Sequence, residues 1–382
     1  MNNDVEWKMV KLGDVLRIGN GRDYKHLKSG DIPVYGTGGY MCSVNDYLYE
    51  GETVCIGRKG TIDVPQFHSG KIWTVDTLFY TYSFNGVYPK FIYYAFCMID
   101  WKSKNEATGV PSLSKGIIEK VRIPVPYKNG SPDLETQALI AQKLSDMDSL
   151  ITAKEELLAK KRNLKIGAMQ KLIKDEESEN WRKVSLGDCA IIIRGGSPRP
   201  IENYITNSPN GINWIKIGDV AVGAKYIEQT EEKIIAAGMN KSRAVKAGDF
   251  LLSNSMSFGR PYILKIDGAI HDGWLAIQKY SQTFDTDYLY YVLSSDIVLN
   301  QYLSMAAGSS VLNLNKQIVA KVMIPVPSDS DGNPDFIKQK QIASILSDMD
   351  TEISSIENEI TKLQNLKTGM MQNYFCFNKV EE

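Results

Sequence analysis

Histidine is scarce in this sequence, and its scarcity limits the chemistry that the chain can perform. The 382 residues include three histidines, His26, His68 and His271, and none belongs to an HExxH pattern. A zinc hydrolase or a histidine-based triad therefore has little to build on. The HDGW segment (residues 271–274) joins histidine to aspartate, but its β-rich setting and lack of further ligands favour a strand-edge contact. We expect no metal site.

The signatures of other enzymes are missing as well. The sequence has no GxxxxGK[ST], no GxSxG and no NPP[FY] motif, which argues against a nucleotide-cradling loop, an α/β-hydrolase and an adenine methyltransferase. Five scattered cysteines are typical of reduced, structural thiols: Cys42, Cys55, Cys97, Cys189 and Cys376. We therefore expect a non-catalytic chain that holds no cofactor of its own.

Long hydrophobic runs and an excess of either charge are also lacking. Without a leader or an apolar stretch of membrane length, we expect a cytoplasmic protein with no membrane contact. Lysine and arginine number 44 and aspartate and glutamate 45, a formal net charge of −1. Any contact with nucleic acid must then come from positive side chains clustered on one face.

What the sequence does contain is an internal duplication. Residues 139–173 and 341–375 share a helical pattern that includes LSDMD, at a constant offset of 202 positions. An IPVP segment precedes each copy, at 123–126 and 324–327, and each half opens with WxxVxLGD, from Trp7 and from Trp181. Two repeats of this length are too few for a solenoid. We predict recognition or docking domains at 1–138 and 179–338, each followed by a spacer helix, at 139–178 and 339–376.

The second helix carries an apolar seam with 4-3 spacing, which is the pattern of a coiled coil. The predicted interface of the helix pair consists of Ile140, Leu144, Met147, Ile151 and Leu158 in the first copy, and Ile342, Leu346, Met349, Ile353, Ile356, Ile360 and Leu363 in the second. Lys154, Lys161 and Lys165 interrupt the first copy. The alternative is that each helix packs only on the core of its own domain.

Helices of about 35 residues reach roughly 50 Å and serve as spacers. If they pair around a pseudo-two-fold axis, they run antiparallel with one globular domain at each end, the geometry by which symmetric readers span two DNA half-sites. The alternative is a non-catalytic scaffold whose two equivalent domains dock protein partners.

The globular parts are rich in β-branched and aromatic residues punctuated by glycine, which predicts short strands. Helices are expected near residues 89–99 and 287–299. We predict an α+β fold: two mixed, mostly β domains with helices, separated by two long antiparallel coiled-coil helices in a pseudo-two-fold tandem repeat.

Two glycine-flanked loops are candidates for DNA contact. In GRKG (residues 57–60), the glycines would let the backbone approach a polyanion while Arg58 and Lys59 reach out. In the corresponding place of the second half, SNSMSFGRP (253–261) offers Asn254, Ser257 and Arg260, and asparagine and arginine make bidentate contacts to adenine and guanine. The plainer interpretation is a solvated hairpin tip. Weaker candidates are Arg199 in the RGGSPRP loop (194–200) of the second half and Arg22 in roughly the corresponding place of the first half.

Together these segments resemble one known family. WxxVxLGD, IPVYGTGG (32–39), GETVCIGRKG (51–60), VDTLFY (75–80), TGVPSLSK (108–115), IPVP and QxxIAxxLSDMD are similar to the specificity subunit of type I restriction–modification systems. The resemblance covers nearly the whole chain, including its duplication.

The resemblance implies two target recognition domains that read the halves of a bipartite, non-palindromic sequence in double-stranded DNA. It implies partners as well: two methyltransferase subunits, which use S-adenosylmethionine, and through them restriction and translocase subunits. The family's DNA-facing loops map onto Tyr35, Thr37, Arg58 and Lys59 in the first domain and onto Asn254, Ser257 and Arg260 in the second. Neither the bases read nor the spacer length follows from the sequence.

Overall fold

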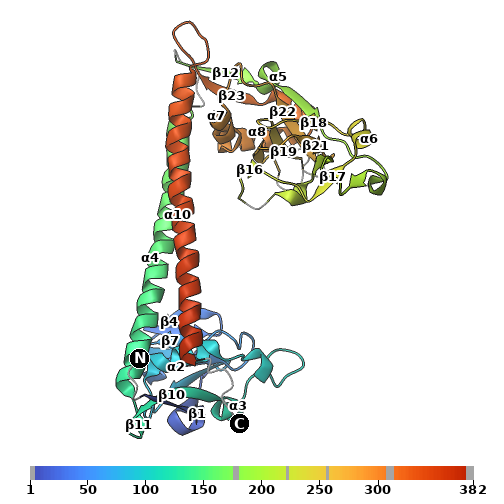
Figure 1. The fold of residues 1–382 in the computed structure, drawn as a ribbon. Helices are drawn as coiled ribbons and strands as arrows, with labels where there is room; N and C mark the ends of the chain where they lie inside the picture. The colour runs from blue at the N-terminus through green and yellow to red at the C-terminus, as the bar shows by residue number, and fades with distance from the viewer. Residues whose placement is uncertain (1–4, 175–179, 221–222, 255–257, 307–313, 376–382) are drawn as a thin grey trace. The chain divides into compact units, whose positions relative to one another are not determined.

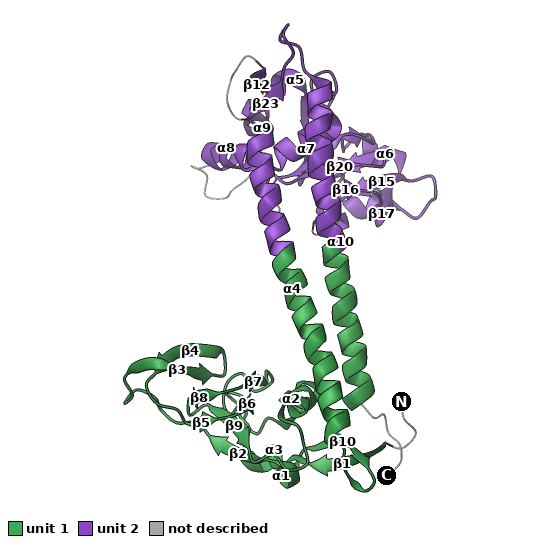
Figure 2. Cartoon of the chain, turned by 90° about the vertical axis from the view of Figure 1, so that its left-hand side faces the viewer, with its two compact units in different colours: residues 1–157, 356–382 green, residues 158–355 purple. Residues whose placement is uncertain are grey.

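The computed structural model describes residues 5–174, 180–220, 223–254, 258–306 and 314–375 (Figure 1). The chain forms two compact units: unit 1 comprises residues 1–157 and 356–382, and unit 2 comprises residues 158–355 (Figure 2). Each unit thus contains one globular domain, the start of the helix that follows it and the end of the other long helix. We call these globular parts domain 1 and domain 2. The boundaries expected from the sequence instead separate each domain from its helix and stay a prediction.

Domain 1 contains three sheets. Their strand orders are β1(Glu6–Lys11)-β10(Arg122–Lys128)-β11(Ser131–Pro132), β2(Arg17–Asn20)-β9(Leu78–Tyr82)-β6(Thr53–Gly57)-β7(Gln66–His68), and β4(Gly39–Val44)-β3(Ser29–Gly36)-β8(Lys71–Thr74)-β5(Tyr49–Glu50). The WxxVxLGD and IPVP motifs meet in the first sheet, where Trp7 lies opposite Pro126 and Val10 opposite Ile123. In the third sheet β3 and β8 are parallel, while the second sheet is antiparallel throughout.

The helices of domain 1 start where the sequence provides start signals. They are α1(Leu12–Val15), α2(Pro89–Met98), the 3-10 turn η1(Lys102–Lys104) and α3(Lys115–Lys120). Pro89 occupies the first turn of α2, where its missing N–H costs nothing. The Ser114 side chain caps α3 by accepting the Ile117 N–H. The helix α2 confirms the helix that is expected near residues 89–99.

Domain 2 repeats this plan, but in its described residues the first sheet has two strands instead of three, and the second and third sheets have five instead of four. The strand orders are β12(Trp181–Ser185)-β23(Met323–Pro327), β13(Ile191–Arg194)-β22(Trp274–Gln278)-β19(Phe250–Ser253)-β20(Pro261–Leu264)-β16(Tyr226–Ile227), and β14(Ile205–Thr206)-β17(Glu232–Ile234)-β15(Ile212–Ile215)-β21(Gly268–Ile270)-β18(Ala244–Val245). The two sequence motifs meet again, since Trp181 lies opposite Pro327.

The helices of domain 2 are α5(Leu186–Cys189), η2(Ile201–Asn203), η3(Ile217–Asp219), α6(Ala236–Met239), α7(Thr286–Leu293), α8(Asp296–Ala306) and α9(Lys316–Lys321). The prediction of a single helix over residues 287–299 is wrong. Two helices form there: α7 ends at Leu293, because Ser294 adopts φ −86° and ψ −3°, away from the ψ of about −42° that continues an α-helix, and α8 begins at Asp296. Asp285 caps the first of them, and Asn315 caps α9 as Ser114 caps α3.

The two long helices, α4(Leu134–Leu172) and α10(Phe336–Phe375), run antiparallel within each unit. In unit 1, Asp148 pairs with Lys367, and Lys154 lies 2.5 Å from Glu359. In unit 2, Lys161 lies 2.5 Å from Glu352, and Lys165 pairs with Asp350. The lysines that interrupt the apolar seam of the first helix are therefore the residues that bind the carboxylates of the other helix.

None of the predicted interface residues is exposed. Ile140 and Leu144 enter the core of domain 1 together with Met371 and Phe375 from the end of α10. Ile342 and Leu346 enter the core of domain 2 together with Ile173. Farther along the helices, Ile151, Ile356 and Ile360 are buried, while the remaining members are half-buried: Met147, Leu158, Met349, Ile353 and Leu363.

Both helices hold their domains by the same buried amide. Gln137, which is fully buried, accepts the Tyr88 N–H at 2.9 Å and donates to the Gly86 carbonyl at 3.1 Å. Gln339, 202 positions later, accepts the Asp285 N–H at 2.7 Å and donates to the Thr283 carbonyl at 3.0 Å. Satisfying a buried amide from both sides fixes the domain on the helix.

A second shared arrangement lies 11 residues, about three turns, further along each helix. The Tyr94 hydroxyl donates to Asp148 at 2.8 Å, and the Tyr291 hydroxyl donates to Asp350 at 2.8 Å. With Lys367 and Lys165 these residues form two Tyr–Asp–Lys clusters, one in each unit. The predicted α+β tandem repeat with two long antiparallel helices is confirmed.

Candidate nucleic-acid interface

Four predicted DNA-contacting residues of domain 1 are organised by one short backbone segment, residues 74–77, which we call connector 1. Its carbonyls accept the Arg22 N–H at 2.8 Å, through Thr74, and the Arg58 N–H at 2.8 Å, through Thr77. Its Val75 N–H donates to the Tyr35 carbonyl at 3.0 Å, and the Lys59 N–H also reaches Thr77, at 3.3 Å. Segments far apart in the sequence thus meet at this connector.

The GRKG turn is built for close backbone approach. A Cβ atom at Gly57 would lie 2.0 Å from the Thr61 carbonyl oxygen, and Gly60 has φ +88°, so glycine suits both places. Arg58 and Lys59, between them, are exposed. The turn projects two cations while its backbone stays pinned.

The TGVPSLSK loop lies directly beside this turn. The Leu113 N–H donates to the Arg58 carbonyl and the Gly60 N–H to the Pro111 carbonyl, both at 2.9 Å. A hollow of about 450 Å³ lies between turn and loop, and it is lined by Asn20, Arg58, Lys59, Phe79, Glu106, Ser112, Leu113, Ser114 and Lys115. The structure thereby adds Asn20 and Lys115 to the candidates. Their nearness to Arg58 depends on long-range pairing and has no local signal in the sequence.

Tyr35 and Thr37 lie on the neighbouring hairpin. Tyr35 is half-buried and stacks on His68, with ring centroids 3.7 Å apart. Gln66 Nε2 donates to the Thr37 carbonyl at 3.3 Å. Burial lowers the pKa of His68 to about 4, so this ring is neutral at pH 7 and adds no positive charge. The stack braces the hairpin, and the Tyr35 side chain stays partly exposed to a ligand.

Domain 2 contains the same device in residues 270–273, which we call connector 2. It accepts the Gly196 N–H at 3.1 Å and the Asn254 N–H at 3.1 Å, and its His271 N–H donates to the Ile215 carbonyl at 3.1 Å. The Leu314 N–H donates to the Asn254 carbonyl at 2.9 Å, as Leu113 does to Arg58. By these backbone bonds Asn254 is the counterpart of Arg58, 196 positions later.

The side chains at connector 2 bind one another. Asp272 accepts the Ser197 hydroxyl at 2.9 Å, and its other oxygen lies 3.4 Å from Arg199 Nη2. His271 Nε2 lies 2.9 Å from the same carboxylate. Asn254 is 6% exposed, and its amide donates to the Asp272 carbonyl at 3.2 Å.

The charge of Asp272 depends on these neighbours. Burial alone would raise the pKa of its carboxyl, but the hydrogen bond from Ser197 and the nearby positive charges lower it below the usual range. The cluster is therefore held by an ionised carboxylate. HDGW, expected from the sequence to be a strand-edge contact, forms its centre.

The remaining candidates of domain 2 are less well placed. Arg199 is exposed and thus able to reach a ligand, with 80% of its side chain accessible. Arg260 is half-buried, and its guanidinium lies 5.7 Å from the centre of the Tyr262 ring. Ser257 lies outside the described residues.

Within the described ranges, the structure reveals no metal-binding group of three or more His, Cys, Asp or Glu side chains. Among the same residues, every helix is too short or too polar to cross a bilayer.

Comparisons with known proteins agree with the sequence motifs. A family model described as "Type I restriction modification DNA specificity domain" matches residues 4–160 and 178–365. The chain is 25% identical over 288 residues to the type I restriction enzyme MjaVIII specificity subunit of Methanocaldococcus jannaschii. This alignment covers 69% of this chain and 65% of that protein. It is 25% identical over 380 residues to a putative type I restriction enzyme specificity subunit of Haemophilus influenzae, covering 93% and 90%.

Solved structures show the same fold. The S subunit of a type I restriction–modification system from M. genitalium matches with a TM-score of 0.65 at 13% identity, over 98% of this chain and 97% of that one. The HsdS subunit from Thermoanaerobacter tengcongensis matches with a TM-score of 0.50 at 17% identity, over 99% and 98%. At these identities the likeness concerns the fold alone.

Proposed function

Because this chain belongs to the family of type I restriction–modification DNA specificity subunits, we propose that its two domains read the two halves of a bipartite, non-palindromic target in double-stranded DNA. The observation that carries this proposal is the pair of equivalent connectors. Equivalent backbone bonds place Arg58 in domain 1 and Asn254 in domain 2 at the same point of the fold. One docking geometry with two different sets of side chains reads two different half-sites.

In domain 1, Arg58 is the candidate for base contact, because an exposed guanidinium on a pinned turn suits the paired acceptors of guanine. Lys59 and Lys115 line the same hollow as Arg58, and Arg22 binds the same connector. These three cations suit phosphate oxygens, which position the protein without selecting a sequence. Tyr35 and Thr37 supply a neighbouring hydroxyl-bearing edge.

In domain 2, Arg199 and Arg260 are the cationic candidates, and Ser257 adds a hydroxyl to the same predicted set. Asn254 is predicted from the sequence to contact a base, yet its burial and its bond to the Asp272 carbonyl favour a positioning role. The cluster around Asp272 then fixes the loop that carries Arg199.

We assign no catalysis to this chain. Methyl transfer and cleavage belong to partner subunits: two methyltransferase subunits, whose S-adenosylmethionine supplies the methyl group, and restriction and translocase subunits where a system has them. This chain contributes the alignment of the two half-sites.

The proposal is tested by expressing the chain with its methyltransferase subunit and mapping methylated adenines across a genome by single-molecule sequencing. The expected result is a split motif of two short specific blocks separated by a fixed gap of unspecified bases. A stable complex that adds no methylation would instead favour the scaffold alternative, in which the equivalent domains dock proteins.

A further inference from the structure

The β2-β9-β6-β7 sheet of domain 1 and the corresponding β13-β22-β19-β20-β16 sheet of domain 2 differ at one edge. In domain 2, β20 pairs with β19 on one side and with the parallel strand β16 on the other. In domain 1, β7 is the counterpart of β20, since Phe67 opposite Val54 matches Ile263 opposite Phe250 at an offset of 196. Among the described residues no strand pairs with the other side of β7. Domain 1 thus presents a free edge where domain 2 has a fifth strand.

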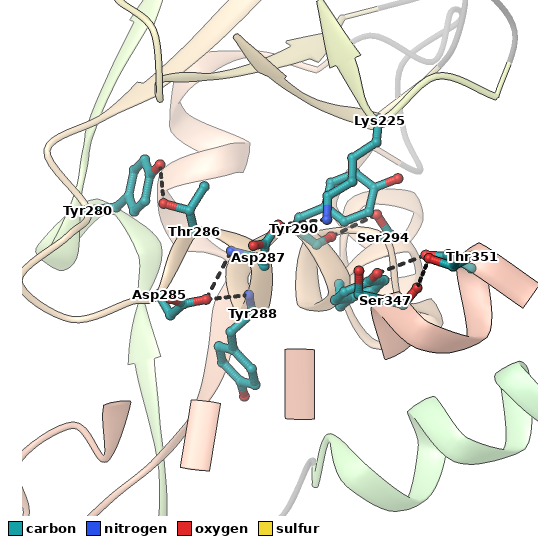
Figure 3. Close-up of polar contacts among 12 residues, drawn as sticks. Lys225, Tyr280, Asp285, Thr286, Asp287, Tyr288, Tyr290, Ser294, Ser347 and Thr351 are labelled. Atoms are coloured by element: carbon teal, nitrogen blue, oxygen red, sulfur yellow. Dashed lines mark hydrogen bonds and ion pairs between the residues drawn. The ribbon is translucent and has the colours of Figure 1, made fainter. Parts of the chain in front are cut away.

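The strand β16 also brings a side chain onto α7 of domain 2, at a site that we call cleft 2 by its correspondence to the cleft of domain 1 described below. Lys225, directly before β16, lies 2.6 Å from Asp287 of α7 and sits 4.8 Å and 5.0 Å from the ring centres of Tyr290 and Tyr291. Figure 3 shows the lysine reaching Asp287 beside Tyr290, with Ser347 and Thr351 of α10 nearby. Aromatic faces and a carboxylate together suit an ammonium group.

The equivalent cleft of domain 1, cleft 1, is open. Its volume is about 470 Å³, and it is lined by Phe67, Lys90, Tyr93, Tyr94, Ser145, Asp148, Ser149, Thr152, Ala153 and Glu156. Tyr93 and Tyr94 match Tyr290 and Tyr291 at an offset of 197, and Ser145 and Asp148 match Ser347 and Asp350 at 202. The two clefts share these wall residues, but in the described part of the chain a lysine from an added strand occupies cleft 2, whereas no added strand covers cleft 1.

One charge is reversed between the clefts. Lys90 stands where Asp287 stands in domain 2, at the same offset of 197. Its ammonium donates to the Ser145 hydroxyl at 2.7 Å and lies 5.4 Å from the Phe67 ring. No described carboxylate forms an ion pair with it. The nearby Asp148 is already neutralised by Lys367 and bonded to the Tyr94 hydroxyl.

We propose that the β7 edge and cleft 1 together form a docking site for an extended segment of a partner protein, which adds as a parallel strand and places a carboxylate side chain on Lys90. Domain 2 supplies the template, with the charges exchanged: β16 is the added strand and Lys225 the inserted side chain. Strand addition gives main-chain hydrogen bonds, and the cleft selects the side chain. This inference is independent of which bases the domains read.

The template also sets the register. In domain 2 the Ile263 and Lys265 N–H groups each donate at 2.9 Å, to the carbonyls of Lys225 and Ile227. The corresponding donors on the edge of domain 1 are the amides of Phe67 and Ser69. The partner's acidic residue therefore precedes, by one position, the residue that lies opposite Phe67.

The test uses the full chain and two fluorescent peptides that copy residues 223–229, one unchanged and one with Lys225→Glu, followed by fluorescence anisotropy. We expect the Lys225→Glu peptide to bind at least about tenfold more tightly than the unchanged one. In the chain variant Lys90→Asp the preference should invert, whereas Lys143→Asp, an exposed lysine of α4 outside cleft 1, should change neither affinity.

A second variant separates the strand from the charge. Ser69→Pro removes one edge N–H at an exposed position and should weaken both peptides alike without altering their ratio. The absence of binding by either peptide at about 1 mM would overturn the proposal. Displacement of the acidic peptide by duplex DNA would assign Lys90 to a nucleic-acid surface instead. Tighter peptide binding after removal of residues 376–382 would identify the chain's own end as the occupant, and this too would overturn it.

Discussion

Arg58 in domain 1 and Asn254 in domain 2 occupy one position of a shared backbone frame, yet their side chains behave in opposite ways. Each residue donates its N–H to the connector, and its carbonyl accepts the N–H of a leucine from the loop that precedes α3 or α9. Arg58 is exposed beside other cations, whereas Asn254 is buried and bonded to the Asp272 backbone. The frame is set by main-chain hydrogen bonds, and these do not depend on which side chain is present.

Under the proposed function, this difference gives a duplicated fold two specificities. Residues that hold each domain on its helix recur with their partners, as Gln137 and Gln339 do. The side chains held at the two connectors, Arg58 and Asn254, do not recur in this way. We propose that stability and recognition lie in separable sets of residues, and the following substitutions test that separation.

The largest effect is expected from the shared helical seam. Ile356 is 6% exposed, so Ile356→Asp would bury an unpaired carboxylate and lower the free energy of unfolding by about 3 to 5 kcal/mol. The matched control is Ile345→Asp on the same helix, since Ile345 is 46% exposed. Denaturant unfolding measures both. Equal effects of the two variants would mean that the seam does not stabilise the protein.

The duplication predicts that residues 1–180 alone form a dimer. Asp148 and Lys165 lie 202 positions before Asp350 and Lys367, so two copies of α4 can form both Tyr–Asp–Lys clusters with each other. With methyltransferase subunits, this dimer should favour a palindromic target built from the first half-site.

Lys165→Glu should raise the dissociation constant of that dimer about 100-fold, or about 2.7 kcal/mol, because it places like charges together in two clusters. Lys160→Glu, at an exposed position of the same helix, is the control. Analytical ultracentrifugation gives the dissociation constants. A fragment that stays monomeric at all concentrations would contradict the two-fold relation.

At the tip of domain 1, Arg58→Ala should cost about 1 to 3 kcal/mol of specific DNA binding and relax one base position. Lys59→Ala should instead weaken binding to all sequences and reduce the salt dependence by about one counterion. Titrations of the assembled complex with matched and mismatched duplexes distinguish the two. If Arg58→Ala weakened every duplex equally, Arg58 would be a phosphate contact.

The smallest effect concerns the pH dependence of domain 2. The pKa of Asp272 is lowered in the folded protein, so its contribution to stability is present above the unfolded carboxyl pKa of about 3.9 and is lost as the pH falls through the lower folded value. Asp272→Asn should therefore reduce the loss of stability between about pH 5 and pH 3. Unfolding midpoints across this range measure it, with Glu228→Gln, an exposed carboxyl, as the control. If the unfolding midpoints of wild type and Asp272→Asn changed equally with pH, the Asp272 carboxylate would not contribute to the pH dependence of stability.

The helices and their pairing could be predicted from the sequence because their signals are periodic and duplicated. The heptad spacing identified the seam, although it gave no reason for Lys154, Lys161 and Lys165. Their role depends on carboxylates of a helix roughly 200 residues away, which periodicity within one segment does not reveal. The break at Ser294 was missed as well, since apolar residues lie on both sides of it and the sequence pattern continues through it.

The candidate site was predictable only in part. Glycines on either side of Arg58 and Lys59 indicated an exposed turn, and that turn is exposed. The sequence did not show that Asn254 is buried, that Asp272 organises its loop, or that Lys115 lies beside Arg58. These facts arise from pairing between distant segments around each connector, and the spacing of residues within a loop carries no information about it.

The most direct test of the central claim is a map of methylated adenines made with the methyltransferase complex of the wild-type chain, of Arg58→Ala and of Arg199→Ala. If each domain reads one half-site, Arg58→Ala should relax bases in only one block of the split motif and Arg199→Ala in only the other, with the gap unchanged. A substitution in one domain that altered both blocks, or a motif without two blocks, would contradict the account.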